Sequence, residues 1–262
     1  NMKKDLIPIN PYTIQQALPQ LKIHYYPEIA STNQLAKQLI LNNKGQQVQV
    51  VLTNHQTKGY GRHGRPFSSP ATGGIYLTLT LPVTTHDLTS PGLFTTAAGV
   101  GVVRTLTSTL HQPAQIKWVN AVLVAGKTVC GILTEVVLDE ETNQVRGIVL
   151  GIGINYLSQL SDFPPELHDR IGTLAQAAQA NHCSSTNFTI ALLTQVLTAL
   201  KERTQPALMA EYRQYSVVIG HEVTLNLGNQ KITGRVQDIN DQGELVLTSG
   251  AVFSAGEVVK LR

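Results

Sequence analysis

Glycine and basic residues alternate in residues 56–65, QTKGYGRHGR, a segment without hydrophobic periodicity. Glycine lets the backbone approach a ligand closely and expose its amide N–H groups, and arginine pairs with anionic oxygens in bidentate geometry. The segment therefore predicts a loop that binds a phosphate or a carboxylate. Two other interpretations stay open, a solvated basic loop and a contact to RNA, because glycine-rich loops are common in proteins.

Polar groups also stand at the ends of predicted elements, in four short motifs. These motifs are Ser31-Thr32-Asn33, Lys117-Trp118-Val119-Asn120, Ala125-Gly126-Lys127 and Gly151-Ile152-Gly153-Ile154-Asn155. Each has a purely structural interpretation: a helix N-cap, an edge strand with a buried indole, a hairpin turn and a strand end. Each can equally present hydroxyl, amide or ammonium groups to a small polar ligand.

Residues 121–128, AVLVAGKT, fit the loose pattern of a nucleotide-binding P-loop. A P-loop needs a flexible cradle that leads into a helix, whereas this segment and the residues after it are rich in strand-forming types. We therefore predict a β-hairpin here. Its turn would present the Lys127 ammonium on a rigid base.

The sequence suggests no covalent catalysis. It favours no Ser-His-Asp or Cys-His triad, and no His, Cys or Asp cluster has the spacing of metal ligands. Cys130 and Cys183 form no CxxC motif, so neither a zinc site nor a disulfide framework is expected. What remains is charge neutralisation and positioning. That chemistry suits adenylation, in which a carboxylate attacks the α-phosphate of a nucleotide and cations spread the developing charge.

Composition narrows the class of protein. The chain has 262 residues, of which 42% are hydrophobic, and its formal net charge is +3. This charge is too slight to favour nucleic acids or membranes through bulk electrostatics. No apolar run approaches the roughly 20 residues that span a membrane, and the N-terminal segment lacks the apolar core of a signal peptide. We therefore expect a cytoplasmic protein with a packed core.

Hydrophobic periodicity and turn residues predict the elements that must position these motifs. Helices are expected over residues 11–18, 32–44 (ending at Gly45), 91–110 and 187–203, and strands over 22–28, 47–53, 75–82 and consecutively over 115–155. From about residue 217, short alternating runs predict five strands of a small β-barrel. The result is an α+β fold, a mixed β-sheet with flanking helices. The expected domains are a tail with a short helix (1–20), a catalytic domain (21–215) and the barrel (217–262).

In their order and spacing, these motifs resemble the biotin–protein ligases. Residues 56–70, QTKGYGRHGRPFSSP, are similar to that family's ligand-binding loop, and GIGIN at 151–155 is similar to its strand end behind the adenylate. Residues 117–135, KWVNAVLVAGKTVCGILTE, are similar to its KWPND segment with the downstream lysine and GILxE strand. STN at 31–33 and the C-terminal barrel, which is SH3-like in the family, match as well. The resemblance covers nearly the whole chain from about residue 22.

The resemblance implies an ATP-dependent, AMP-forming biotin–[acetyl-CoA-carboxylase] ligase. Biotin and MgATP give biotinyl-5′-AMP, and the biotinyl group then passes to a lysine of a biotin carboxyl carrier protein. The residues that match the family's biotin contacts are Ser31, Thr32, Asn33, Gln56, Tyr60, Gly61, Arg62 and Lys127. Those that match its adenylate site are Arg62, Arg65, Trp118, Asn120 and Asn155, with Arg62 and Lys127 as the catalytic cations.

Three positions depart from the family pattern. Tyr60 replaces the first arginine of the loop, and Val119 and Ala121 replace the proline and aspartate of KWPND. The loop therefore lacks one positive charge. Without the aspartate, Mg²⁺ must rely on the nucleotide, on water or on another acid, of which Glu135 is the nearest in the pattern, and no metal ligand is assigned.

Other functions stay open beside the ligase. They are a lipoate or octanoate protein ligase of the same fold, a biotin-binding protein without catalysis, and an RNA-binding module. Some family members begin with a DNA-binding winged helix-turn-helix, but only about 20 residues precede the first predicted strand, so we expect no DNA binding. No membrane partner is expected, and a homodimer is left open.

Overall fold

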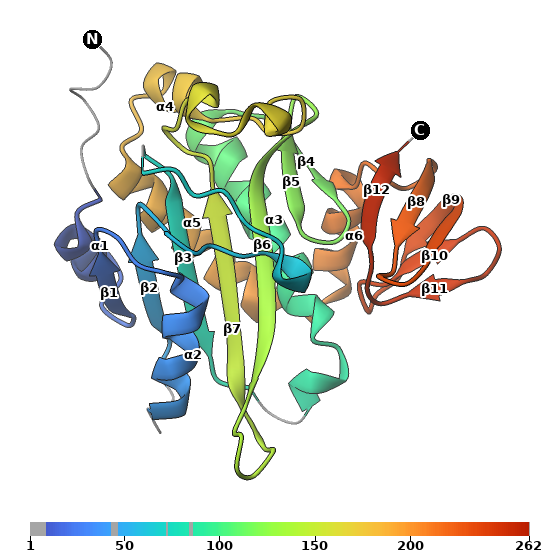
Figure 1. The fold of residues 1–262 in the computed structure, drawn as a ribbon, viewed down its shortest axis with the longest axis horizontal. Helices are drawn as coiled ribbons and strands as arrows, with labels where there is room; N and C mark the ends of the chain where they lie inside the picture. Colours follow the sequence, from blue (N-terminus) through green and yellow to red (C-terminus); the bar gives the residue numbers. More distant parts are fainter. Residues whose placement is uncertain (1–8, 43–46, 72, 84–85, 262) are drawn as a thin grey trace.

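A mixed β-sheet of seven strands forms the centre of the protein (Figure 1). The computed structural model describes residues 9–42, 47–71, 73–83 and 86–261. The strand order is β1-β2-β3-β7-β6-β5-β4; β1 and β2 are parallel, and the other neighbours are antiparallel. The strands are β1 (Lys22–Tyr26), β2 (Gln49–Thr53), β3 (Ile75–Leu81), β4 (Ala114–Lys117), β5 (Ala121–Val124), β6 (Lys127–Leu138) and β7 (Val145–Ile154).

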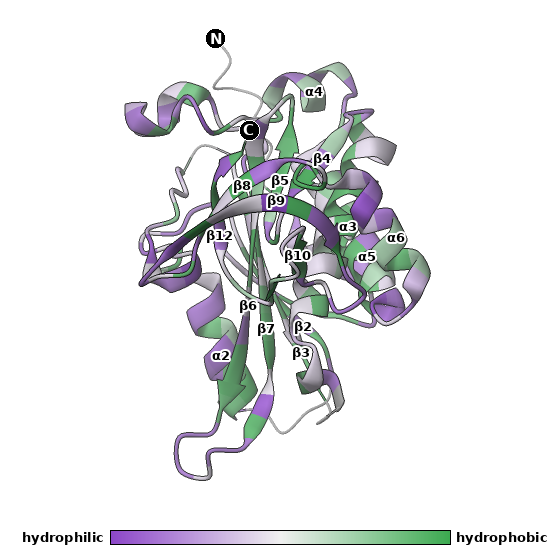
Figure 2. Ribbon diagram, turned by 90° about the vertical axis from the view of Figure 1, so that its right-hand side faces the viewer, coloured by the Kyte–Doolittle hydropathy of each residue, from purple (hydrophilic) through white to green (hydrophobic). Residues whose placement is uncertain are grey.

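Helices cover the two faces of this sheet unequally. One face carries α2 (Thr32–Asn42), and the other carries α3 (Gly92–Leu110), α5 (Ser185–Glu202) and α6 (Pro206–Tyr215), as Figures 1 and 2 show. The α3 and α5 backbones approach so closely that a Cβ atom on Gly101 would lie 2.7 Å from Val196 Cα. This contact requires glycine, and it packs α3 tightly against α5 on the face of the sheet opposite α2. The remaining helices are α1 (Pro11–Ala17), α4 (Ala175–Ala180) and short 3₁₀ turns at Arg62–Gly64, His86–Thr89, Leu160–Asp162 and Pro165–Leu167.

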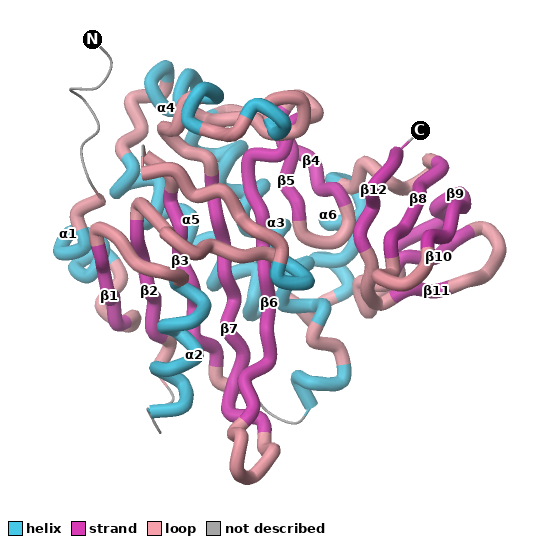
Figure 3. Tube along the Cα trace, in the orientation of Figure 1, coloured by secondary structure: helices cyan, strands magenta, loops and turns pink. Residues whose placement is uncertain are grey.

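The glycine-rich loop after β2 crosses the sheet on the α2 side, in front of β7 and β6 (Figure 3). It folds into a short hairpin, in which Gly61 N donates to Arg65 O at 2.8 Å and Phe67 N donates to Gly59 O at 3.0 Å. Its tip has positive φ at His63 (57°) and Gly64 (69°). A left-handed backbone is easy for glycine and uncommon for other residues, so glycine at position 64 favours this tip.

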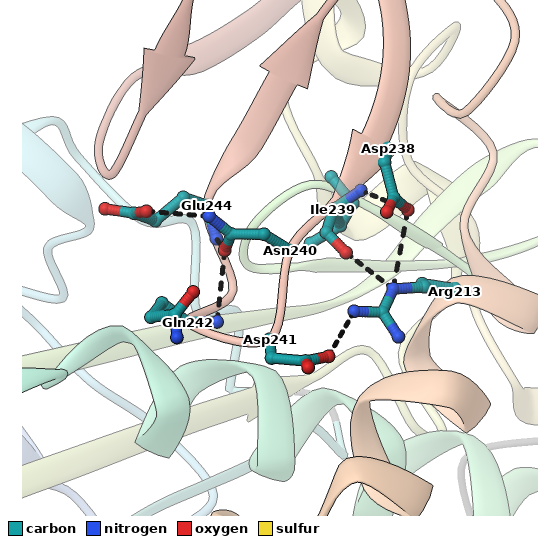
Figure 4. Close-up of polar contacts among 7 residues, drawn as sticks. All are labelled: Arg213, Asp238, Ile239, Asn240, Asp241, Gln242 and Glu244. Atoms are coloured by element: carbon teal, nitrogen blue, oxygen red, sulfur yellow. Dashed lines mark hydrogen bonds and ion pairs between the residues drawn. The ribbon is translucent and has the colours of Figure 1, made fainter.

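A separate antiparallel sheet of five strands lies at the C-terminal end, red in Figure 1. Its order is β11-β10-β9-β8-β12. Two contacts near the turn at residues 240–244 join this sheet to the rest of the protein. Trp118 Nε1, which follows β4, donates to Gly243 O at 3.0 Å. Arg213 of α6 donates to Ile239 O at 2.6 Å and forms ion pairs with Asp238 and Asp241 (Figure 4). The strands are β8 (Glu222–Asn226), β9 (Lys231–Ile239), β10 (Leu245–Leu247), β11 (Val252–Phe253) and β12 (Glu257–Leu261).

The predicted fold class, a mixed sheet with flanking helices and a small C-terminal β-unit, is confirmed. Residues 115–155 divide into β4 to β7, and the hairpin predicted at Lys127 joins β5 to β6. The helix expected from residue 187 begins at Ser185, and its N-cap Ser184 accepts a bond from Asn187 N. The helix stop expected at Gly45 lies outside the described residues. Among the helices of the described ranges, none is long and apolar enough to cross a membrane.

Candidate functional site

A cavity of about 70 Å³ lies beneath the glycine-rich loop, on the face of the sheet that α2 covers. Six of the residues selected as biotin contacts surround it: Ser31, Thr32, Asn33, Gln56, Tyr60 and Gly61. The rest of its wall comes mainly from β6 and β7: Phe67, Tyr76, Asn120, Gly131, Ile132, Leu133, Gly151, Ile152 and Gly153. The structure thus gathers three segments that are far apart in the chain, residues 31–33, 56–61 and 151–153.

The start of α2 supplies the polar end of the cavity. Ser31 Oγ accepts a bond from Gln34 N at 3.4 Å, as an N-cap does. The first N–H groups of a helix have no partner within the helix, and here Thr32 N donates to Gln56 Oε1 at 2.9 Å. Ser31, Thr32 and Asn33 are all buried, so the cap fixes three polar side chains at the cavity.

A chain of hydrogen bonds continues from α2 through the sheet to the loop. Thr78 Oγ1 lies 2.6 Å from Asn33 Oδ1 and 2.8 Å from Thr32 Oγ1, which in turn lies 3.1 Å from Gln56 Oε1. Gln56 Nε2 then donates to Ser69 Oγ at 3.1 Å. The three oxygen–oxygen contacts share two hydroxyl protons, those of Thr32 and Thr78. Only two of the three contacts can therefore be hydrogen bonds at one time.

The carboxylate of Glu135 on β6 holds the other side of Asn33. It accepts Asn33 Nδ2 at 2.8 Å, Lys37 Nζ at 2.7 Å and the Tyr60 hydroxyl at 2.9 Å. Burial, followed by this bond to Glu135, raises the pKa of Tyr60, so its hydroxyl stays a proton donor at neutral pH. The same carboxylate therefore ties α2 to the glycine-rich loop.

Glycines in β6 and β7 make room for side chains that stand on the sheet. A Cβ atom on Gly151 would lie 2.2 Å from Asn33 Oδ1. Gly131 and Gly153 face each other across the two strands, and Cβ atoms there would lie 3.0 and 2.6 Å from the Phe67 ring. The GIGIN motif is thus a strand floor on which Asn33 and Phe67 rest.

Phe67 also separates the first cavity from a second one of about 170 Å³. The ring lies edge-to-face with Tyr76, with centroids 6.2 Å apart. Asn155, selected for the adenylate site, lines the second cavity, and its Nδ2 donates to Gly172 O at 2.9 Å. The other residues of that wall are Pro66, Ser68, Thr128, Val129, Cys130, Gly131, Phe163, Leu167 and Ile171.

Arg62 and Lys127, the predicted catalytic cations, do not line the first cavity. Arg62 Nη1 donates to Gly256 O of the C-terminal sheet at 2.7 Å, and Lys127 Nζ donates to the Asp169 carbonyl. Arg65 pairs with Glu257, also outside. Burial lowers the pKa of Arg62 without neutralising a guanidinium at neutral pH. The two predicted catalytic cations thus rest on neutral backbone oxygens.

The structure also places Trp118, Asn120 and Glu135 of the sequence analysis. Trp118 lines neither cavity, because its buried indole donates to Gly243 O between the two sheets. Asn120 lines the first cavity, and its Nδ2 donates to Ile132 O at 2.9 Å. Glu135 is no open metal ligand, since three donors already occupy its oxygens. Within the described part of the chain, no group of three or more His, Cys, Asp and Glu side chains could hold a metal ion.

Sequence reasoning missed several contacts that build the site. Lys37 lies four residues after Asn33 on α2, a spacing that puts both on one helix face and could have been noticed. Phe67 lies in the quoted loop without an assigned role, although an aromatic residue beside a glycine-rich strand often packs on it. Thr78 has no local signal, because it is one of two threonines that alternate with leucine along β3.

Comparisons with known proteins identify the family of the chain. The model of the biotin/lipoate A/B protein ligase family matches residues 25–155, and that of the biotin protein ligase C-terminal domain matches residues 218–261. A biotin–[acetyl-CoA-carboxylase] ligase of Mycobacterium tuberculosis is 32% identical over 226 residues, which cover 81% of this chain and 79% of that protein. The bifunctional ligase/repressor BirA of Bacillus subtilis is 30% identical and aligns over 85% of this chain and 68% of its own.

Solved structures show the same architecture. The biotin protein ligase of Aquifex aeolicus in complex with biotin and ATP superposes with a TM-score of 0.73 at 25% identity, covering 92% of this chain and 98% of its own. The biotin protein ligase of Leishmania major with biotinyl-5-AMP superposes with a TM-score of 0.59 at 19% identity, covering 88% and 97%. The second likeness concerns the fold alone.

Gly151→Ala should destabilise the protein, because the new methyl group would push Asn33 off Thr78 and Glu135. Overpacking and a buried amide left without partners should together lower the free energy of unfolding by about 1–3 kcal/mol. Urea unfolding measures this change. Gly92→Ala is the matched control, since its Cβ would have no neighbour nearer than 3.9 Å. Equal stability of the Gly151→Ala variant and the wild type would contradict the tight fit of Asn33.

Proposed function

The chain belongs to the biotin/lipoate A/B protein ligase family, and we propose that it acts as a biotin–protein ligase. One observation carries the proposal: side chains that match the family's biotin contacts surround a single polar-ended cavity. Above that cavity runs a loop with two arginines, Arg62 and Arg65. Neutral polar side chains in the cavity and arginines above it suit a substrate with a polar head group and a carboxylate tail.

The cavity is suited to the ureido ring of biotin. That ring offers two N–H donors and one carbonyl acceptor, which must all find partners once they leave water. The oxygens of Thr32, Asn33 and Gln56 can accept such N–H donors. The Ser31 hydroxyl can donate to the ureido carbonyl. The apolar part of biotin would lie on the glycine floor of β6 and β7.

Ligand binding requires the glycine-rich loop to move. A cavity of about 70 Å³ is smaller than the engineered cavity of about 150 Å³ that takes up benzene, and biotin is larger than benzene. Phe67 forms the wall toward the second cavity, so its movement would join the two spaces. We propose that biotin and the adenylate share this joined space, with Asn120 and Asn155 beside the nucleotide.

The proposed reaction has two steps. A carboxylate oxygen of biotin attacks the α-phosphorus of ATP, the bond to the bridging oxygen breaks, and pyrophosphate leaves. The amine of the carrier lysine then attacks the acyl carbon of biotinyl-5′-AMP, AMP leaves, and the amine loses a proton. Magnesium would arrive as part of the substrate MgATP.

Arg62 and Lys127 are proposed to stabilise the first step. Each now donates to a neutral carbonyl, of Gly256 and Asp169 respectively. A phosphate or carboxylate oxygen carries negative charge, so either cation would bind it more strongly than the neutral carbonyl that it now contacts. Both groups would therefore move onto the substrates as negative charge develops at the α-phosphate.

The proposed partner is the biotin carboxyl carrier protein of a biotin-dependent carboxylase. A cytoplasmic location is proposed with it, in keeping with two free cysteines, Cys130 and Cys183. A homodimer stays a prediction.

The direct test is biotin transfer to a carrier. Incubation with biotin, MgATP and a carboxyl carrier domain should add the mass of one biotinyl group to the carrier, measured by mass spectrometry. Omission of ATP is the control and should give no addition. No addition with the folded protein and all substrates present would contradict the proposed function.

Arg62→Ala and Lys127→Ala should each slow pyrophosphate release about a hundredfold while biotin binding changes far less, because both cations act mainly in the transition state. Lys201→Ala, an exposed lysine on α5, is the matched control and should behave as the wild type. Near-normal pyrophosphate release in Lys127→Ala would remove Lys127 from the mechanism and leave Arg62.

A further inference from the structure

Lys37 is a cation of the site that neither the motifs nor the loop accounts for. It follows Asn33 by one helical turn on α2, and both side chains reach the carboxylate of Glu135. Lys37 Nζ lies 2.7 Å from Oε1, and Asn33 Nδ2 lies 2.8 Å from Oε2. A residue of the cavity and a lysine outside it therefore share one anion.

The environment of Glu135 requires a positive charge. Its side chain is 24% exposed and that of Lys37 is 32% exposed, so both are largely withdrawn from water. A carboxylate in such a place is unfavourable unless it has both hydrogen bonds and a counter-charge. Burial lowers the pKa of Lys37, but the bond to Glu135 raises it, and the net shift is upward. The ammonium is therefore charged at neutral pH.

The loop itself brings no charge to this carboxylate. Its contribution is the neutral hydroxyl of Tyr60, 2.9 Å from Glu135 Oε2. Lys37 Nζ also lies 5.8 Å from the centroid of the Tyr60 ring, within the range of a cation–π contact. The placement of Tyr60 over the cavity thus depends on Lys37 both through Glu135 and directly.

We propose that Lys37 is a positioning residue of the biotin site. It neutralises Glu135, which holds Asn33 at the floor of the cavity and Tyr60 over its mouth. The identity of the ligand rests on the proposed function, whereas the placement of the loop does not. An ordinary exposed ion pair would affect neither biotin binding nor the placement of the loop, because such pairs contribute little on their own. The difference here is that the carboxylate is shared with two residues of the cavity wall.

The test compares Lys37→Leu with Lys201→Leu, which makes the same change at an exposed site of α5. Leucine suits a helix, so α2 should persist. Calorimetric titration with biotin should show a Kd about tenfold higher for Lys37→Leu, and adenylation kinetics should show a raised KM for biotin with kcat changed less than about threefold. Lys201→Leu should match the wild type. An unchanged Kd in Lys37→Leu would overturn the proposal.

Two further variants separate charge from packing. Lys37→Arg keeps a cation within reach of Glu135, whereas Lys37→Met keeps most of the side-chain length without the charge. Lys37→Arg should keep a Kd within about threefold of the wild type, and Lys37→Met should bind biotin as weakly as Lys37→Leu. A wild-type Kd in Lys37→Met would contradict the charge-neutralising role.

Loop cleavage keeps the test independent of the ligand. Without biotin, an arginine-specific protease should cut after Arg62 several times faster in Lys37→Leu than in Lys201→Leu, because Tyr60 is no longer held at Glu135. If the wild type binds no biotin, the proposed function fails and this comparison still decides the inference. Equal cleavage of the two variants would overturn it.

Discussion

A half-buried carboxylate has to be neutralised and hydrogen-bonded, and the arrangement of the site depends on how this is done for Glu135. Its three partners come from two segments that do not otherwise share a strand or helix: Lys37 and Asn33 from α2, and Tyr60 from the glycine-rich loop. The sheet supplies the anion itself, from β6. Helix, sheet and loop are therefore joined at one charge, and the cavity is the space enclosed by that junction.

The glycines of β6 and β7 leave the space that α2 and the loop need to approach the sheet. Side chains from α2 and the loop can rest on the sheet only where the strands carry no Cβ atom. Asn33 uses the space above Gly151, and Phe67 uses the space above Gly131 and Gly153. The floor proposed for biotin is thus the surface on which the loop now rests. The proposed binding of biotin on this floor would therefore require Phe67 to move.

The sequence was sufficient for the fold and for the part of the site that is local in the chain. Alternating apolar residues predicted the strands, and the serine before α2 marked a helix start with three polar side chains together. The positions of Arg62, Lys127 and Trp118 could not be predicted, because each donates to a backbone carbonyl, of Gly256, Asp169 and Gly243. Any residue type offers such a carbonyl, so the sequence holds no signal for these contacts.

The central claim is that the cavity at the start of α2 recognises a ring with N–H donors. Calorimetric titration of the wild-type protein with biotin and, separately, with lipoate tests it most directly, because the dithiolane ring of lipoate has no N–H group. A site that hydrogen-bonds a substrate N–H rejects an analogue without it by about 10⁴-fold or more. The account predicts one biotin bound per chain and no measurable heat from lipoate at the same concentrations. Lipoate binding as tight as that of biotin would contradict it.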